Sequence, residues 1–315
     1  MFFSNSTHEQ VPARWGFSAL ILALLTVQNT MATPVDPSTP TTRRAPFDAK
    51  TFFRYLDSSC DIDAVNRAGE DLLDLADAAV EIFDLGRDPN ATQLQKGTFL
   101  TFMGSLFLNG GPKTPAMTLR EGLGPDKKYL WCDETAFQWV TTKQEGPEKG
   151  DPLEGGGGAL YILPGRRPRD LEDVYMFRGR NKLSLCTPDE GSGMSSLRGW
   201  AEMNGPAMGL CPEAFNLPAK SLAESKNKVY EDGTRLNSLD TPGSVLFHES
   251  THAVLGLNMG LRETYGVDRC INLASDDPIK AIYNADNWKW LALAYLHKGN
   301  SWFDGTAARV QELGN

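Results

Sequence analysis

Residues 248–252 read HESTH, an HExxH pentapeptide that contains two of the four histidines in the chain. On a helix, side chains four positions apart lie on the same face, so His248 and His252 can both reach one zinc ion. Glu249 lies beside the first histidine, where it can take a proton from a zinc-bound water. The alternative is a chance pentapeptide with two ordinary helix histidines. The spacing predicts Zn²⁺ as the cofactor and metal-assisted hydrolysis as the chemistry.

The residues on either side predict the helix that this spacing requires. Thr241 can N-cap a helix, Pro242 suits the first helical position, and Gly256 can end the helix. Apolar residues between them give the helix a surface to bury. We therefore expect a helix over 242–256.

A catalytic zinc ion needs a third protein ligand and one position for water. The next histidine, His297, falls at a predicted helix end, so we expect the third ligand to be an acid. The candidate acids that follow the pentapeptide are Glu263, Asp268, Asp276, Asp277 and Asp286.

A longer run downstream carries a family resemblance. After Tyr265-Gly266 and Leu273-Ala274, residues 277–287 read DPIKAIYNADN. Together with the pentapeptide, this run resembles the aspzincins, which are secreted, mostly fungal zinc endopeptidases that include deuterolysin and the peptidyl-Lys metalloendopeptidases. The resemblance covers residues 241–292. It implies a zincin-like fold and a protein or peptide substrate.

The resemblance breaks at the third ligand. The family pattern GTxDxxYG supplies an Asp, but counting back from Tyr265 places Arg262 at that position, and a cation cannot bind zinc. We predict that Glu263, one residue on, is the ligand, with Asp286 or Asp268 as the alternative. A two-histidine site with weak or no catalysis is the remaining alternative, because the number of ligands governs affinity and geometry.

The resemblance also implies roles for two further residues. Tyr265 matches a tyrosine whose hydroxyl stabilises the oxyanion in the transition state; the alternative is a tyrosine packed at a turn. Asp286 matches the acid that binds the substrate side chain after the scissile bond in lysine-selective members. Those members carry a second acid three residues later, and here that residue is Lys289, which argues against lysine selectivity. Asp286 can instead hold a ligand histidine in one tautomer.

The net charge and the N-terminal residues restrict the classes of protein to which this chain can belong. The net charge of −9 over 315 residues argues against nucleic-acid binding. Residues 1–32 are predicted to be a signal peptide, because Arg14 precedes the apolar run 15–27 and the small residues Thr30 and Ala32 follow it at a cleavage site. The apolar run is too short to span a bilayer. A short internal anchor, or a start at Met31, is the alternative. We expect a secreted, extracellular protein with no stable membrane association after signal cleavage.

Beyond the signal peptide, residues 33–46 are a Pro/Thr-rich linker or short pro-segment, and residues 47–315 are expected to be a single zincin-like metallopeptidase domain. Five cysteines in an exported chain favour disulfides over metal ligands. One is left over, and the weakly favoured pair is Cys186–Cys211. The sequence carries no signal for an oligomeric state.

Hydrophobic periodicity predicts an α+β fold, with a helical N-terminal part, a small mixed sheet, the HExxH helix and a C-terminal helix. An edge strand near 159–163 or 207–210 would bind the substrate peptide by β-addition. The predicted helices cover 61–85, about 91–108, 242–256 and about 278–297, and the predicted strands cover 129–132, 137–141, 159–163, 183–186 and 207–211.

The sequence therefore predicts a secreted zinc metalloendopeptidase with Glu249 as the general base. The alternative is a catalytically impaired, zincin-fold secreted binding or effector protein, because Arg262 replaces the third-ligand Asp of the family. A weaker alternative is a zinc hydrolase that acts on non-peptide substrates.

Overall fold

The computed structural model describes residues 44–85, 92–105, 113–123, 128–171, 173–180, 182–187, 197–203, 205–223, 225–226, 228–257 and 263–309. The chain from Phe47 to Asn315 forms one compact unit of mixed helices and small sheets, and the predicted α+β class is confirmed. The predicted signal peptide lies outside the described residues. Among the residues that are described, no helix has the length and apolar character that a membrane span requires.

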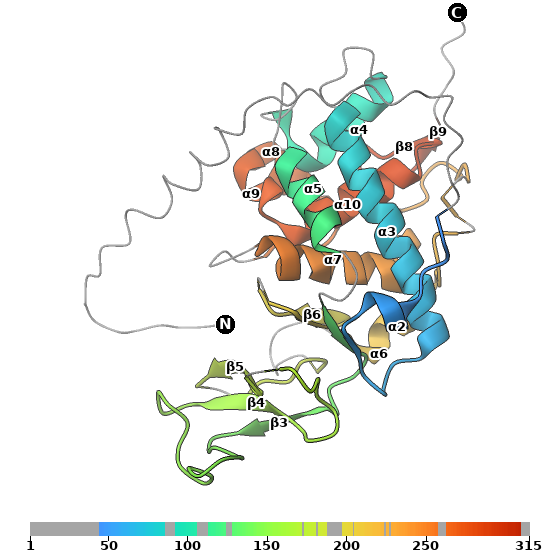
Figure 1. The fold of residues 1–315 in the computed structure, drawn as a ribbon. Helices are drawn as coiled ribbons and strands as arrows, with labels where there is room; N and C mark the ends of the chain where they lie inside the picture. The colour runs from blue at the N-terminus through green and yellow to red at the C-terminus, as the bar shows by residue number, and fades with distance from the viewer. Residues whose placement is uncertain are drawn as a thin grey trace, which may run out of the picture. The chain divides into compact units, whose positions relative to one another are not determined.

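Five helices form the main layer of this unit (Figure 1). α3 (Ile62–Leu85), α7 (Pro242–Leu255) and α10 (Ala285–Leu296) pack against one another, and α4 (Gln93–Met103) and α5 (Lys113–Gly122) cover them. The predicted first helix is confirmed almost to the residue. The fifth helix, α5, was not predicted from the sequence.

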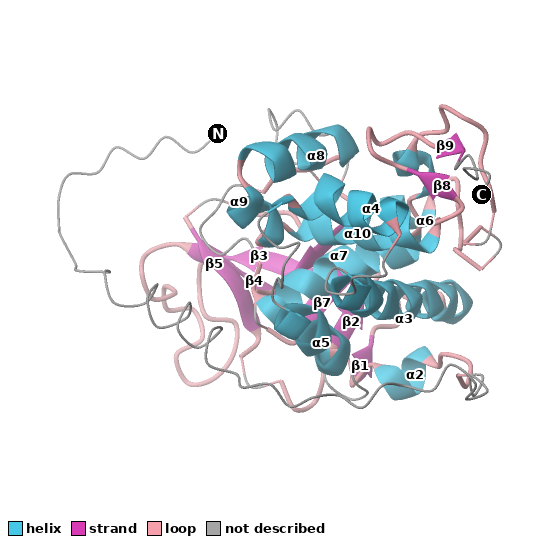
Figure 2. Ribbon diagram, turned by 90° about the horizontal axis from the view of Figure 1, so that it is seen from above, coloured by secondary structure: helices cyan, strands magenta, loops and turns pink. Residues whose placement is uncertain are grey.

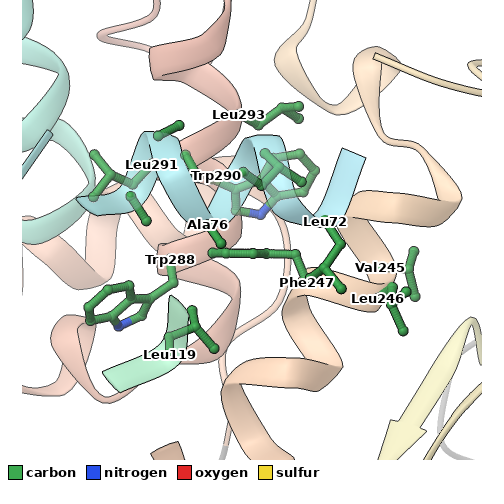
Figure 3. Packing of buried hydrophobic residues seen from close by; sticks show 14 of the residues in the cluster. Leu72, Ala76, Leu119, Val245, Leu246, Phe247, Trp288, Trp290, Leu291 and Leu293 are labelled. Atoms are coloured by element: carbon green, nitrogen blue, oxygen red, sulfur yellow. The ribbon is translucent and has the colours of Figure 1, made fainter. Parts of the chain in front are cut away.

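The core of this layer is apolar and closely filled. Figure 3 shows Leu72 of α3, Leu119 of α5, Phe247 of α7 and Trp288 of α10 converging, and all four side chains are fully buried. Burying a side chain of this size contributes about 1.5–3 kcal/mol. Since α7 supplies core side chains to this layer, the HExxH helix is held by the largest apolar cluster of the unit.

A four-stranded sheet lies against the other side of α7. Its strands run in the order β1 (Tyr55–Leu56), β2 (Tyr129–Trp131), β7 (Ala207–Leu210) and β6 (Gly199–Ala201). β1, β2 and β7 are parallel, whereas β6 is antiparallel to β7, with Trp200 opposite Gly209. The prediction that 207–210 is an edge strand is wrong, because β7 is paired on both sides.

A second, antiparallel sheet contains β3 (Phe137–Val140), β4 (Gly158–Ile162) and β5 (Tyr175–Gly179). β4 is its central strand, so 159–163 is not an edge strand either. Trp131 and Trp200 of the first sheet pack on Phe137 of the second, with ring centroids 5.4 Å from it in each case. These aromatic contacts join the two sheets.

The predicted strand at 183–186 is absent from the structure. The Glu134 carboxylate accepts hydrogen bonds from the backbone N–H groups of Leu185 and Cys186, both at 3.0 Å. A side chain therefore satisfies the donors that a strand partner would otherwise take. β5, which was not predicted, pairs with β4 on the side opposite β3.

Two disulfides cross-link the unit. The predicted Cys186–Cys211 bond is confirmed, and Cys60–Cys132 is the second. Cys270 is a buried free thiol.

The predicted C-terminal helix at 278–297 is two helices, α9 (Pro278–Ile282) and α10, separated at Tyr283–Asn284. A further helix that was not predicted, α8 (Val267–Asp276), precedes them. The short strands β8 (Asn300–Ser301) and β9 (Ala308–Arg309) pair apart from the two sheets (Figure 2). The remaining short elements are α2 (Ala49–Phe52), α6 (Pro212–Phe215) and the 3-10 helix η2 (Leu236–Leu239).

Candidate metal centre

α7 positions the two histidines of the pentapeptide. Thr241 and Ser244 form a reciprocal capping box, Pro242 is the first helical residue, and Gly256 ends the helix in the left-handed conformation (φ 61°). The predicted helix is therefore confirmed within one residue at each end. One helical turn brings the imidazoles of His248 and His252 together, and their Nε2 atoms lie 3.2 Å apart.

The Glu263 carboxylate faces both imidazoles. One of its oxygens lies 3.3 Å from Nε2 of His248, and the other lies 3.4 Å from Nε2 of His252. Its side chain is 10% exposed. The structure thus brings together the three residues predicted as ligands. Arg262, on which the alternative function depends, lies outside the described residues.

The distances among these three groups suit a zinc ion. Ligands at the corners of a tetrahedron with bonds of about 2.0–2.1 Å lie about 3.3–3.4 Å from one another. The two Nε2 atoms lie 3.2 Å apart, and Glu263 approaches them through different oxygens, Oε1 at 3.3 Å from His248 and Oε2 at 3.4 Å from His252. The Glu263 oxygen nearest His248 is buried and has no hydrogen-bond partner, which is costly unless a cation or donor faces it. The donor types and their proximity therefore fit a zinc ion, which takes imidazole and carboxylate ligands.

Three of the other candidate acids lie elsewhere. Asp268 pairs with Arg235 at 2.8 Å, and Asp277 caps α9 and pairs with Lys280 at 2.8 Å. Asp276 is exposed at the end of α8. None of the three takes part in the contacts around the imidazoles.

Each imidazole makes a second contact through Nδ1. Nδ1 of His248 lies 3.0 Å from Oδ1 of Asp286, and Nδ1 of His252 lies 3.0 Å from the carbonyl oxygen of Leu257. Both partners are acceptors, so both favour the tautomer with hydrogen on Nδ1 and a free lone pair on Nε2. The two histidines are therefore oriented as metal ligands require.

Asp286 is enclosed by groups of the protein. Its Oδ2 accepts hydrogen bonds from the Gly266 N–H (2.7 Å) and from Trp290 Nε1 (2.9 Å), and its Oδ1 lies 3.0 Å from Nζ of Lys289. Burial disfavours the charged carboxylate, but the Lys289 ammonium outweighs it and holds the pKa of Asp286 well below its ordinary value. At 2% exposure, the carboxylate faces His248 rather than solvent. The substrate-binding role of Asp286 stays a prediction that this burial does not favour.

Glu249 lies beside the imidazoles in a space that a glycine leaves open. One of its carboxylate oxygens lies within 4.8 Å of a ring nitrogen of each histidine, and the side chain is 6% exposed. A Cβ atom added to Gly199 of β6 would lie 2.7 Å from Oε1 of Glu249. Sequence analysis missed Gly199, because its contact with α7 depends on how the sheet packs.

Tyr265 covers the solvent side of the cluster. Its ring stacks on that of His248, with centroids 5.9 Å apart and an interplanar angle of 29°. Burial and the nearby Glu263 carboxylate raise the pKa of the Tyr265 hydroxyl, and the residue is 48% exposed. A half-exposed phenol next to the donor set can meet a molecule that arrives from solvent.

Asn284 holds the segment that carries Glu263 and Tyr265. Its Oδ1 accepts from the Thr264 N–H (2.9 Å), and its Nδ2 donates to the Thr264 carbonyl (2.8 Å) and to Oδ1 of Asn287 (2.8 Å). Asn284 was quoted in the family run but was not predicted as a site residue. Asn284 lies where the predicted helix 278–297 is divided into α9 and α10.

Burial and opposing charges set the pKa values of the cluster. Burial lowers the pKa of His248, but the Glu263 and Asp286 carboxylates outweigh it and raise that pKa to about 9. Burial raises the pKa of Glu249, which the imidazoles offset in part. Burial also acts to raise the pKa of Glu263, but His248 and His252 outweigh it and lower that pKa. The carboxylates thus make the space between the imidazoles favourable for positive charge, whether protons or a metal ion.

The chain matches no protein-family model and no curated protein. Among solved structures it is similar to one described as a zinc peptidase from Grifola frondosa, with 16% sequence identity and a TM-score of 0.33. That likeness covers 71% of this chain and 93% of the other chain. A likeness at this level carries no conclusion about activity, which therefore depends on the geometry of the centre itself.

Proposed function

We propose that the protein is a secreted zinc-dependent endopeptidase. The observation that carries the proposal is the meeting of His248, His252 and Glu263, whose imidazole nitrogens and carboxylate oxygens lie 3.2 to 3.4 Å apart in pairs and can face one zinc ion. Glu249 adds a buried carboxylate that is not needed as a ligand. Two ligand histidines, an acidic ligand and a neighbouring free carboxylate are the parts that metal-assisted peptide hydrolysis requires.

A bound zinc ion would supply Lewis acidity toward water and toward the scissile carbonyl. Glu249 would accept a proton from the attacking water and return it to the leaving amine. Tyr265 would turn its hydroxyl from Glu263 toward the oxygen on which negative charge develops. Its position on the exposed side of His248 supports this role.

Asp286 and the Leu257 carbonyl would not bind the metal but would orient the two histidines that do. The Leu257 carbonyl is hydrogen-bonded to Nδ1 of His252, and Oδ1 of Asp286 lies 3.0 Å from Nδ1 of His248, so both groups favour histidines whose Nε2 atoms are directed toward the other donors. We therefore assign Asp286 to the orientation of His248 rather than to the recognition of substrate.

The edge of β6 offers a place for the peptide. The Arg198 carbonyl accepts from the N–H of Cys211, just after β7, and the Glu202 N–H donates to the Ala207 carbonyl of β7, each at 2.8 Å. In an antiparallel ladder alternate residues face opposite sides, so the N–H and C=O groups of Gly199 and Ala201 point away from β7. Within the described part of the chain no strand pairs with that side of β6. An extended peptide added there would pass Glu249, which lies against Gly199.

Secretion is supported by the two disulfides, which form and persist in oxidising compartments. The proposed substrate is thus a protein or peptide met outside the cell.

The test combines metal analysis with digestion of casein, with and without a chelator. We expect the wild-type protein to bind zinc and to cleave casein only without the chelator. Glu249→Gln should keep zinc and lose about 10²–10⁴-fold in activity, because it removes the general base. Full activity of Glu249→Gln would contradict the mechanism, and absence of zinc from the wild-type protein would contradict the proposal. Zinc binding without cleavage of any peptide would favour the binding or effector protein that Arg262 suggests.

A further inference from the structure

A row of charged groups, buried except for Arg198 at its far end, leads away from the candidate ligand His248. Its Nδ1 lies 3.0 Å from Asp286 Oδ1, and the same oxygen lies 3.0 Å from Lys289 Nζ. Lys289 Nζ lies 3.7 Å from Asp240 Oδ2, which accepts a hydrogen bond from Arg198 at 2.7 Å. From Arg198 to Asp286, positive and negative groups alternate, and the row ends on the histidine.

Lys289 is the central member of this row and is enclosed by protein. The residue is 7% exposed, and its Nζ lies 4.0 Å from the centroid of the Trp290 ring. Trp290 in turn donates to the second oxygen of Asp286. The ammonium therefore faces two carboxylates and an aromatic ring.

The position of Lys289 bears on the orientation of Asp286. Oδ2 of Asp286 is held by Gly266 and Trp290, whereas Oδ1 is shared between Lys289 and His248. Without the ammonium, Oδ1 would have one partner fewer, and the buried Asp286 would lose its counter-charge. Partners beyond the ligands fix the orientation of a metal-binding histidine, so a displaced Asp286 would displace His248.

We propose that Lys289 is a positioning residue of the metal centre, which fixes Asp286 so that Nε2 of His248 faces His252 and Glu263. This inference rests on the proposed function, since it requires that the three donors bind zinc. It predicts that Lys289 acts on zinc affinity through Asp286 and not through the stability of the fold.

The chain offers a matched control on the neighbouring helix α9. Asp277 and Lys280 have the same spacing of three residues and a contact of 2.8 Å, but both side chains are at least one-third exposed. The pair caps α9 and makes no contact with the imidazoles. Lys280→Met removes an ammonium from the same kind of pair without touching the centre.

The experiment measures the zinc affinity of the metal-free protein by competition with a chromogenic chelator. We expect Lys289→Met and Asp286→Asn each to weaken zinc binding about 10–100-fold, and Lys280→Met to leave it unchanged. The double variant Asp286→Asn/Lys289→Met should bind zinc as Asp286→Asn does, because Lys289 acts through Asp286. Lys289→Arg should restore part of the affinity that Lys289→Met loses. Circular dichroism establishes that each variant is folded.

Two results would overturn the inference. One is unchanged zinc affinity in Lys289→Met, and the other is a double variant whose fold-loss of affinity equals the product of the two single fold-losses. If Lys289→Met fails to fold, comparison of Asp286→Asn with the double variant decides, and a further loss of affinity in the double variant contradicts the inference. If the wild-type protein binds no zinc, the proposed function itself fails, which is a separate outcome.

Discussion

Charged groups are arranged differently in the helical layer and in the second sheet. Around α7 and α10, Asp240 and Asp286 are each 2% exposed and are paired with other buried or half-buried groups. Three ion pairs that lie wholly within β3–β5 and the segments joining these strands are more open to solvent; they are Lys143–Glu148, Glu145–Arg167 and Arg178–Asp173. The two regions therefore differ in what an ion pair costs and in what its removal would do.

The difference shows where function concentrates in this molecule. An exposed pair contributes about 0–1 kcal/mol and can be lost with little effect. A buried charge is costly unless it is paired, and breaking a buried pair leaves its partner unpaired. Buried, strongly shifted groups that converge on two imidazoles are typical of a functional site. The predictions below test this contrast, from the largest expected effect to the smallest.

Glu263→Gln should give the largest effect. It replaces an anionic oxygen that faces both imidazoles with a neutral amide, so zinc affinity should fall by more than about 100-fold, beyond the loss expected for a residue behind the ligands. Chelator competition measures the affinity, and casein digestion should show loss of cleavage. The matched control is Glu145→Gln in the segment between β3 and β4, where the carboxylate accepts from Tyr161 and Arg167. Equal zinc affinities in the two variants would remove Glu263 from the ligand set.

Gly199→Ala should reduce activity and leave zinc in place. The added Cβ would lie 2.7 Å from Oε1 of Glu249, so the carboxylate must move, and hydrolysis should fall about 100-fold, within the range for loss of a general base. The control is Gly205→Ala, which forces a similar contact with Glu202 in the turn between β6 and β7. If Gly205→Ala costs as much activity as Gly199→Ala, the effect belongs to the hairpin rather than to Glu249.

Asn284→Ala should weaken zinc binding by about 10-fold. Its amide makes both backbone hydrogen bonds of Thr264, the residue between Glu263 and Tyr265, so its loss should loosen a ligand without removing one. Asn300 is a matched control, because its buried amide bonds the N–H and the C=O of Tyr230 in the same way. Asn300→Ala should lower thermal stability while zinc affinity stays unchanged. Equal zinc affinities in the two alanine variants would show that the hydrogen bonds between Asn284 and Thr264 do not contribute to zinc binding.

The sequence predicted the parts of the fold that depend on local contacts. The limits of α7 follow from Thr241, Pro242 and Gly256, which are neighbours of the helix they bound. The three predicted ligands meet because one pair is a helical turn apart and the acid follows soon after. Their role as ligands stays a prediction until zinc binding is measured.

The parts that were missed depend on contacts between distant segments. The apolar pattern continues past Asn284, but the helix is interrupted there. Asn284 is hydrogen-bonded to Thr264, which lies twenty residues earlier in the chain. Gly199 comes to lie against Glu249, and Lys289 becomes buried near the metal centre, only when β6 and α10 pack on α7. Lys289 was noted for its charge, but nothing in the sequence shows that it is enclosed between Asp286 and Asp240.

Arg178→Ala in the second sheet should have the smallest effect. Arg178 pairs with Asp173 at 3.1 Å, with the two side chains 48% and 62% exposed, and its guanidinium lies 5.5 Å from the centroid of the Tyr175 ring. Both contacts are open to water, so the free energy of unfolding should change by less than about 1 kcal/mol, and added salt should reduce the difference further. Urea denaturation at low and high salt measures this change, and zinc affinity and casein cleavage should match those of the wild-type protein. A loss several times larger, or a loss of zinc, would mean that exposure does not separate the two regions, and the contrast between them would fail.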